Sequence, residues 1–212
     1  TSMKRIFPLL FISFFMVACD SPVDNYPDPV VGSYAYGADC SWITEQEHDG
    51  VLFYDSVGQA SDGMRVMRDA GMNAVRLRVW VNHSTGWCNK EDVIAKAKRA
   101  TALKLRVMID FHYSDFWADP AKQKAPKVWA DFDLNQKLQA VYDYTYNSLI
   151  EIKAVGADIG MVQIGNETNA GLAGVFSETE KAQLYQSGAA AVRRVDSDIL
   201  VAVHFTNPEK TA

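Results

Sequence analysis

Residues 105–112 have the sequence Leu105-Arg106-Val107-Met108-Ile109-Asp110-Phe111-His112, a short apolar run that ends in polar side chains. Comparable runs lie at 34–40, 73–80, 159–164 and 199–205, and helix-period segments lie between them at 59–70, 90–103, 133–155 and 178–195. The runs are continuous rather than alternating in polarity, which predicts a parallel sheet with helices on both faces. Repeated strand–helix units indicate an α/β fold, either a barrel or a doubly wound sheet.

The barrel is favoured because neither GxGxxG nor GxxxxGK[ST] follows any predicted strand, so a doubly wound nucleotide-binding fold has no phosphate-binding loop. We therefore expect a (β/α)8 TIM barrel of which about the first five strand–helix units are present. Gly71 and Gly156 fall just past two predicted helices, where a glycine commonly ends a helix. Ser177 and Glu180 have the spacing of a capping box at the start of another.

The N-terminal residues predict an exported protein. A basic start at Lys4 and Arg5 precedes an apolar stretch over 6–17, and Met16-Val17-Ala18-Cys19 resembles a bacterial lipobox. Residues 1–19 are thus expected to be a lipoprotein-type signal peptide with lipid attached to Cys19. The alternative is an ordinary secretory signal with a chance cysteine. Residues 20–32 have the composition of a linker, and 33–212 are expected to be the N-terminal part of a catalytic barrel.

Net charge and cysteine content restrict the classes of partner and the kinds of cross-link that we expect. The chain is 48% hydrophobic, which allows a sizeable core. Its formal net charge of -5 argues against binding to nucleic acid or to anionic lipid and predicts a partner that is uncharged or small. Membrane contact is expected through the lipid anchor only, with the protein secreted and held at the bacterial outer membrane or cell surface. No cofactor and no metal site is expected. Cys40 and Cys88 are candidates for a disulfide in an oxidising compartment; two free buried thiols are the alternative.

Polar and aromatic side chains gather where the predicted strands end, and in a barrel that edge carries the chemistry. The candidates are Asp39 after the first strand, Arg76, Arg78 and Trp80 at the second, Asp110 and His112 at the third, Asn166 and Glu167 at the fourth, and His204 at the fifth.

Each candidate has a structural alternative. Arg76 and Arg78 lie two apart, so they share a face, and each could restrain an active-site carboxylate or form a structural ion pair with Asp39 or Asp110. His112 could contact a sugar hydroxyl or a carboxylate, or be a satisfied structural group. Trp117 could stack on a sugar ring or simply be buried.

Glu167 has the residue type and the strand-end position expected of the catalytic acid in a glycoside hydrolase. Such enzymes need one carboxylic acid to protonate the leaving oxygen and a second carboxylate to attack or to activate water. Asn166, directly before it, could reach the sugar 2-hydroxyl, whose hydrogen bond strengthens in the transition state. The alternative is a solvated loop glutamate.

Four segments together resemble the glycoside hydrolase family 53 endo-beta-1,4-galactanases, also called arabinogalactan endo-beta-1,4-galactanases. The segments are 37–39, 73–80, 110–120 and 158–168, which occur in family order and include the long run Asp110-Phe111-His112-Tyr113-Ser114-Asp115-Phe116-Trp117-Ala118-Asp119-Pro120. The resemblance implies a (β/α)8 barrel that cleaves beta-1,4-galactosidic linkages within galactan or arabinogalactan by retaining double displacement, with Glu167 as acid/base and Asn166 as its partner.

The resemblance also implies a nucleophile at the end of the seventh strand, whereas the fifth predicted strand is the last before Ala212. We therefore expect a C-terminally truncated chain that lacks the nucleophile and is inactive alone. The calcium site of some family members is implied to lie in late loops and is not carried over. Two alternatives stay open: another beta-glycanase of the same clan, such as a mannanase or cellulase, and a noncatalytic glycan-binding surface lipoprotein.

Overall fold

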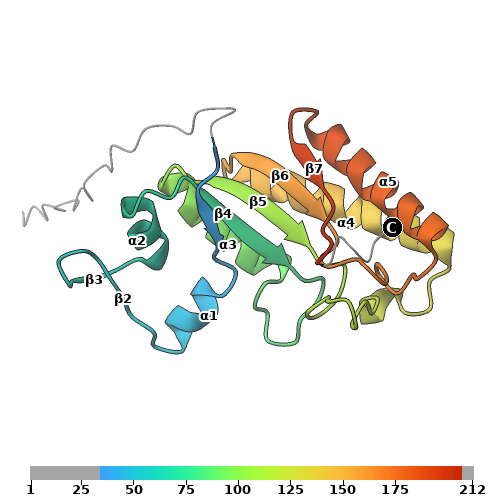
Figure 1. The fold of residues 1–212 in the computed structure, drawn as a ribbon, viewed down its shortest axis with the longest axis horizontal. Helices are drawn as coiled ribbons and strands as arrows, with labels where there is room; N and C mark the ends of the chain where they lie inside the picture. Colours follow the sequence, from blue (N-terminus) through green and yellow to red (C-terminus); the bar gives the residue numbers. More distant parts are fainter. Residues whose placement is uncertain (1–33, 207–212) are drawn as a thin grey trace, which may run out of the picture.

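The computed structural model describes residues 34–206. A five-stranded parallel sheet runs in chain order, β1 (Gly37–Asp39), β4 (Ala74–Val79), β5 (Arg106–Phe111), β6 (Ile159–Ile164) and β7 (Leu200–Ala202). The helices between these strands are α2 (Gly63–Asp69), α3 (Lys90–Ala102), α4 (Leu134–Ala154) and α5 (Glu178–Val195) (Figure 1). Parallel strands that neighbour one another in chain order and are joined by helices confirm the predicted α/β class and its TIM-barrel order.

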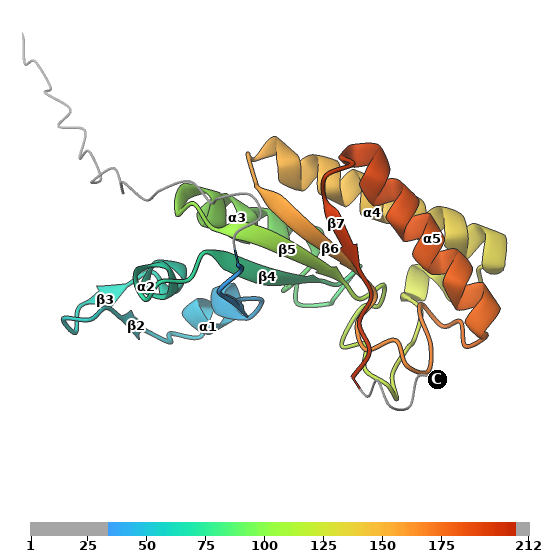
Figure 2. The ribbon, with the colours of Figure 1, turned by 45° about the horizontal axis from the view of Figure 1, so that its top comes forward.

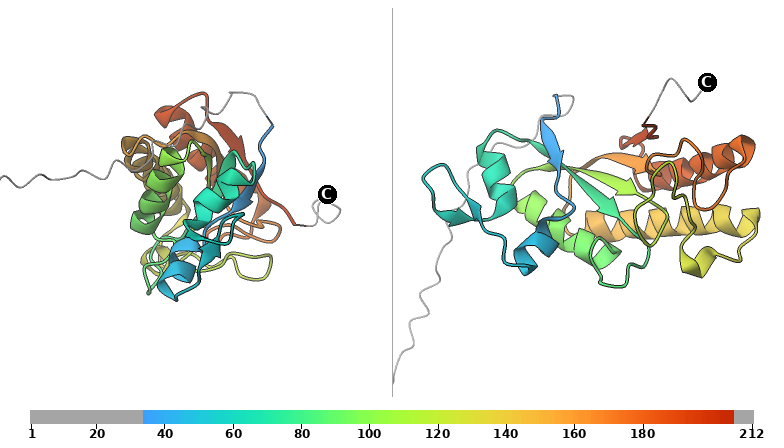
Figure 3. Two further views of the ribbon diagram at one scale, coloured as in Figure 1. Left: turned by 90° about the vertical axis from the view of Figure 1, so that its left-hand side faces the viewer. Right: turned by 60° about the horizontal axis from the view of Figure 1, so that its bottom comes forward.

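The two faces of the sheet differ. Helices α3, α4 and α5 lie together against one face, as Figures 2 and 3 show. The other face lines a hollow of about 410 Å³, to which all five strands contribute, with Ala38, Met108, Met161 and Leu200 among the lining residues. The prediction that helices cover both faces is therefore wrong for the described residues, because the second face is the interior of the barrel.

Strand pleat sorts side chains between these faces. In β4, Val75, Leu77 and Val79 belong to the apolar core, whereas Arg76 and Arg78 alternate with them and point to the opposite face. The register pairs Asp39 with Arg76, and it pairs Arg78 with Asp110 in β5. Charged side chains are thereby brought together inside the barrel.

The connection after β1 departs from the prediction. A helix was expected over 59–70, but α2 begins only at Gly63, and the preceding residues form a small hairpin of β2 (Phe53–Tyr54) and β3 (Ala60–Ser61). Asp62 ends the hairpin and caps the helix, since its side chain accepts a hydrogen bond from the Arg65 backbone N–H at 3.0 Å. The short helices α1 (Ile43–His48) and η1 (Lys127–Trp129) were not predicted.

Helix ends mostly follow the sequence signals. Gly71 and Gly156 have φ of 98° and 83° just past α2 and α4, as predicted. Ser177 forms only half of the expected capping box, because its side chain accepts from the Glu180 N–H and no reciprocal bond is formed. A complete capping box lies instead at the start of α4, between Asp133 and Gln136.

The predicted signal peptide, with Cys19, and the linker at 20–32 lie outside the described residues. Within 34–206, no helix has the length and apolarity needed to cross a membrane.

Candidate active site

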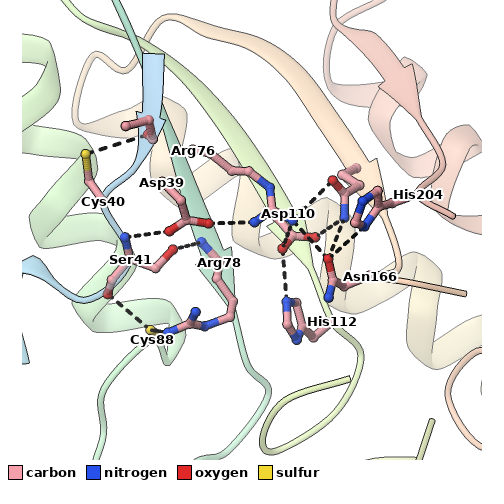
Figure 4. Close-up of polar contacts among 12 residues, drawn as sticks. Asp39, Cys40, Ser41, Arg76, Arg78, Cys88, Asp110, His112, Asn166 and His204 are labelled. Carbon is pink, nitrogen blue, oxygen red and sulfur yellow. Dashed lines mark hydrogen bonds and ion pairs between the residues drawn. The ribbon is translucent and has the colours of Figure 1, made fainter. Parts of the chain in front are cut away.

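The side chains predicted from the strand ends meet at the carboxyl edge of the sheet (Figure 4). A hydrogen-bonded network joins five of them, namely Asp39, Arg76, Asp110, His112 and Asn166. Arg78 lies apart from this network, directed toward Cys88.

Arg76 is the centre of the network. Its Nη1 lies 2.5 Å from Asp39 Oδ2 and its Nη2 lies 2.6 Å from Asp110 Oδ2. Nη2 also donates to Asn166 Oδ1 at 2.9 Å. One guanidinium on β4 therefore connects the strands on both sides of it with the loop that follows β6.

Asp39 is held as a carboxylate. Burial raises the pKa of this group, but hydrogen bonds from Ser41 and the charge and hydrogen bond of Arg76 outweigh burial, so the net pKa lies below the usual 3.8. Ser41 N–H donates to Oδ1 at 2.9 Å, while Oδ2 faces the guanidinium. Both carboxylate oxygens thus have partners that favour the charged form.

Asp110 and His112 form a fully buried pair, 0% and 1% exposed. His112 Nδ1 lies 3.2 Å from Trp80 Nε1 and 3.1 Å from the Ala118 backbone N, and both of these atoms are obligate donors. The imidazole proton therefore sits on Nε2, which donates to Asp110 Oδ2 at 2.9 Å. With both ring nitrogens occupied, His112 orients Asp110 and Trp80 and does not face a sugar hydroxyl.

Gln163 belongs to the network although no site was predicted there. Its Nε2 donates to Asp110 Oδ1 at 2.5 Å and to the Gly165 carbonyl at 2.9 Å. A signal existed in the sequence, since Gln163 is the one amide in the otherwise apolar run 159–164. A buried strand amide needs hydrogen-bond partners, which points to a polar interior.

Asn166 is buried at 3% exposure, and its hydrogen-bond partners fix which end of the side-chain amide is oxygen and which is nitrogen. Its Oδ1 accepts from Arg76, and its Nδ2 donates to the Ala118 carbonyl at 2.8 Å. His204 Nδ1, from the segment after β7, lies 3.0 Å from the same Oδ1. The second amide hydrogen of Nδ2 is left for a ligand.

Glu167 differs from its neighbours in having no partner for its carboxylate among the described residues. Its side chain is partly exposed, and its backbone takes a left-handed φ of 50°. A non-glycine residue with positive φ is held by its surroundings. Here Gln123 Nε2 donates to the carbonyls of Asn166 and Glu167 at 2.8 and 3.1 Å, and the Glu167 N–H faces His204 Nδ1 at 3.2 Å.

Two side chains of α5 fix the loop just beyond Glu167. Lys181, 1% exposed, donates to the carbonyls of Thr168 and Asn169 at 3.1 and 3.2 Å. Tyr185, one helical turn later, donates to Thr168 Oγ1 at 2.6 Å. Neither these residues nor Gln123 lies in a pattern that sequence reasoning could connect with the site. The backbone at and beside Glu167 is thus fixed by Gln123, His204 and Lys181, while its partly exposed carboxylate stays free of contacts among the described residues.

Arg78 does not have the anionic partner that was expected. It is 0% exposed and forms no ion pair within the described chain. Its Nη2 donates to Cys88 Sγ at 3.2 Å, and its guanidinium carbon lies 4.1 to 4.4 Å from the ring centroids of three tryptophans, Trp42, Trp80 and Trp117. Cation–π contacts therefore replace the predicted carboxylate.

Trp80 and Trp117, both predicted for substrate binding, take different positions. Trp80 is 1% exposed, so it supports other side chains and cannot itself be a stacking surface. Trp117 is partly exposed and its ring centroid lies 5.5 Å from that of His112. Trp42 is 38% exposed beside it and was missed, since it lies in the short connection after β1 that showed no helical periodicity.

The predicted disulfide is not formed: Cys40 and Cys88 are both free and buried. Cys40 Sγ lies against Met67 Sδ at 3.3 Å, whereas Cys88 Sγ contacts the Ser41 carbonyl at 3.3 Å. Burial raises the pKa of Cys40 to about 12 and also raises that of Cys88. The two thiols occupy separate packing environments and stay protonated, which disfavours oxidation.

Among residues 34–206, no three His, Cys, Asp or Glu side chains are arranged to hold a metal ion. What the site offers is one unpartnered carboxyl group with an adjacent amide donor, at the edge of a dense polar network. This arrangement can transfer a proton to a bound neutral ligand.

Comparisons with known proteins point to one family. The family model described as glycosyl hydrolase family 53 matches residues 35–212. The endo-beta-1,4-galactanase of Bacillus subtilis (strain 168) is 47% identical over 182 residues, which are 82% of this chain and 42% of that protein. The arabinogalactan endo-beta-1,4-galactanase of Cellvibrio japonicus (strain Ueda107) is 33% identical over 220 residues, 97% of this chain and 57% of that protein.

Two solved structures are similar in fold and sequence. One is from a study of two fungal beta-1,4-galactanases, with a TM-score of 0.76 and 35% identity over 81% of this chain and 53% of the other. The second is the GH53 catalytic domain of Ignisphaera aggregans, with a TM-score of 0.73 and 33% identity over 87% of this chain and 53% of the other. The chain thus spans about half the length of the proteins it matches.

The Asp39 environment predicts a pH-dependent stability. Because the folded-state pKa is depressed, the stabilisation by the Asp39 carboxylate is present above the unfolded-state value and is lost as the pH falls through the folded-state pKa. Asp39→Asn should therefore lower the free energy of unfolding more at roughly pH 6 than at roughly pH 3, measured by urea denaturation.

Asp131→Asn is the matched control, since Asp131 is exposed and such substitutions usually change stability by less than about 0.5 kcal/mol. A destabilisation by Asp39→Asn that is equal at both pH values would show that the carboxylate charge does not stabilise the network.

Proposed function

Because the chain belongs to glycosyl hydrolase family 53, we propose that the whole protein is an endo-acting hydrolase of beta-1,4-galactosidic linkages in galactan and arabinogalactan. The observation that carries this proposal is Glu167, whose carboxylate has no partner in the described chain at the carboxyl edge of a barrel sheet. An uncharged polysaccharide also fits the formal net charge of -5.

Glu167 acts as acid and then as base. In the first step its proton passes to the glycosidic oxygen while a second carboxylate attacks the anomeric carbon, so that the leaving sugar departs as a neutral alcohol. In the second step Glu167 removes a proton from water as this water replaces the enzyme carboxylate at the anomeric carbon, with net retention of configuration. No described residue is assigned the role of the second carboxylate.

The polar network has a supporting role in this mechanism. Arg76, Asp110 and Gln163 fix Asn166, so that its remaining amide hydrogen is directed toward the 2-hydroxyl of the sugar beside Glu167. A fixed donor loses no rotamer entropy on substrate binding. Its hydrogen bond is therefore available to the transition state, where it strengthens.

We further propose that the protein is exported and held at the bacterial outer membrane or cell surface by lipid on Cys19. The lipobox-like run Met16-Val17-Ala18-Cys19 after an apolar segment supports this. A polysaccharide too large to enter the cell would be cut at that surface.

Lipid attachment is tested by metabolic labelling with palmitate in a bacterial host that expresses the whole protein. We expect label in the unchanged protein and in Cys40→Ala, and none in Cys19→Ala. Label that persists in Cys19→Ala would contradict the proposed anchor.

Substrate choice is tested by incubating the whole protein with beta-1,4-galactan, beta-1,4-mannan and cellulose. We expect galactan alone to yield oligosaccharides, with a rapid fall in viscosity because internal bonds are cut. Preferential cleavage of mannan or cellulose would replace galactan as the substrate, and galactan binding without products would support a noncatalytic glycan-binding protein.

Glu167→Gln in the whole protein separates acid catalysis from other roles. Loss of general acid help should lower kcat/KM for galactan by about 10²–10⁴-fold, while formation of the glycosyl-enzyme from a dinitrophenyl galactoside stays near the unchanged rate, because that leaving group needs no proton. Glu151→Gln, in an exposed ion pair on α4, is the control. Equal losses on both substrates would show that Glu167 is not the acid.

A further inference from the structure

Arg78 is a completely buried cation with no carboxylate partner among the described residues, which is unusual for arginine. Its Nε and Nη1 have no hydrogen-bond partner there, and its Nη2 reaches only the sulfur of Cys88. Cys88 stays a neutral thiol, because burial raises its pKa although Lys96 and Arg78 lower it, and its S–H faces the Ser41 carbonyl. The charge of Arg78 must therefore be stabilised by other groups.

Three indole rings surround the guanidinium. Its carbon lies 4.3 Å from the ring centroid of Trp42, 4.4 Å from that of Trp80 and 4.1 Å from that of Trp117. A cation within about 6 Å of an indole face is attracted by the ring quadrupole, and more strongly when water is excluded. We refer to Trp42, Trp80 and Trp117 as the tryptophan cluster.

The tryptophan cluster joins three separate connections of the barrel. Trp42 is the N-cap residue of α1 after β1, Trp80 directly follows β4, and Trp117 lies in the loop after β5. Their ring centroids lie 5.8 to 6.3 Å apart. The Arg78 guanidinium contacts all three rings, so it links the three connections to β4.

The cluster borders the candidate active site. Trp80 Nε1 donates to His112, and the Trp117 centroid lies 5.5 Å from that of His112. Trp42 is exposed and Trp117 is partly exposed, and flat indole surfaces stack on the apolar faces of sugar rings. A change in their positions would alter how a sugar chain lies beside Glu167.

We propose that Arg78 is a positioning residue that holds Trp42 and Trp117 as a stacking surface for the galactan chain, and that it touches no substrate itself. This inference rests on the proposed galactanase function. It assigns Arg78 to polysaccharide binding, in contrast to Arg76, which belongs to the network around Asn166 and Glu167.

The test is Arg78→Met in the whole protein, which keeps a long apolar side chain but removes the charge. We expect KM for galactan to rise about tenfold, equivalent to about 1.4 kcal/mol, with kcat changed less than about twofold, the signature of lost binding shared by ground and transition states. Hydrolysis of a dinitrophenyl galactoside, which occupies few subsites, should be unchanged. The near-ultraviolet circular dichroism should weaken as the indoles lose fixed positions.

Arg106→Met is the matched control, because Arg106 begins β5 at the opposite edge of the sheet and pairs with Asp158; it should leave KM and the dichroism unchanged. Arg78→Lys keeps the charge without the planar guanidinium, so KM for galactan should rise by a smaller factor than in Arg78→Met. If Arg78→Met does not fold, the KM of Arg78→Lys tests the proposal.

An unchanged KM in the variant that folds would overturn the proposal, as would a fall in kcat with unchanged KM. A parallel loss on galactan and on the aryl galactoside would show a general structural role and would overturn it too. If the unchanged protein does not cleave galactan, the proposed function fails instead, and the near-ultraviolet signal of the variants still reports whether Arg78 orders the tryptophan cluster.

Discussion

The ion pairs of Arg76 are the constraint on which the rest of the site depends. The half-buried guanidinium of Arg76 is stabilised by anionic and polar partners, because an uncompensated buried charge is costly. Asp39 and Asp110 supply the charge, and the amide oxygen of Asn166 completes the set at 2.9 Å. Since these partners come from β1, β5 and the loop after β6, one side chain on β4 links the ends of four neighbouring strands.

Two kinds of support keep the proposed acid/base in place. The polar network fixes Asn166, which precedes Glu167 in the chain. Contacts to backbone groups from Gln123, Lys181 and His204 hold the loop itself, where Glu167 has a φ of 50°. Such strain persists only where surrounding contacts over-determine the conformation. The carboxylate is left without a described partner, which keeps it available to a ligand.

Much of this arrangement could be predicted from sequence, because apolar runs that end in polar residues mark both a parallel sheet and its functional edge. The two-residue period placed Arg76 and Arg78 on one face, but it could not assign their partners. The partners of these arginines lie partly in loops. Trp42, which contacts Arg78, belongs to a connection whose two-residue strands and six-residue helix are too short to show a period. Gln123 and Lys181 meet the site only through tertiary packing. The disulfide prediction failed because an oxidising compartment allows two cysteines to pair but does not determine where each thiol points.

The network around Arg76 fixes Asn166 next to Glu167, and we propose that a galactan chain binds against these two residues. A crystal structure of the whole protein with Glu167→Gln and a bound beta-1,4-galacto-oligosaccharide tests it most directly. We expect a glycosidic oxygen within about 2.6–3.2 Å of the residue 167 side chain, a 2-hydroxyl on Asn166 Nδ2, and Arg76 still paired with Asp39 and Asp110. A sugar bound directly to Arg76 with Asn166 displaced, or an oligosaccharide remote from residue 167, would contradict it.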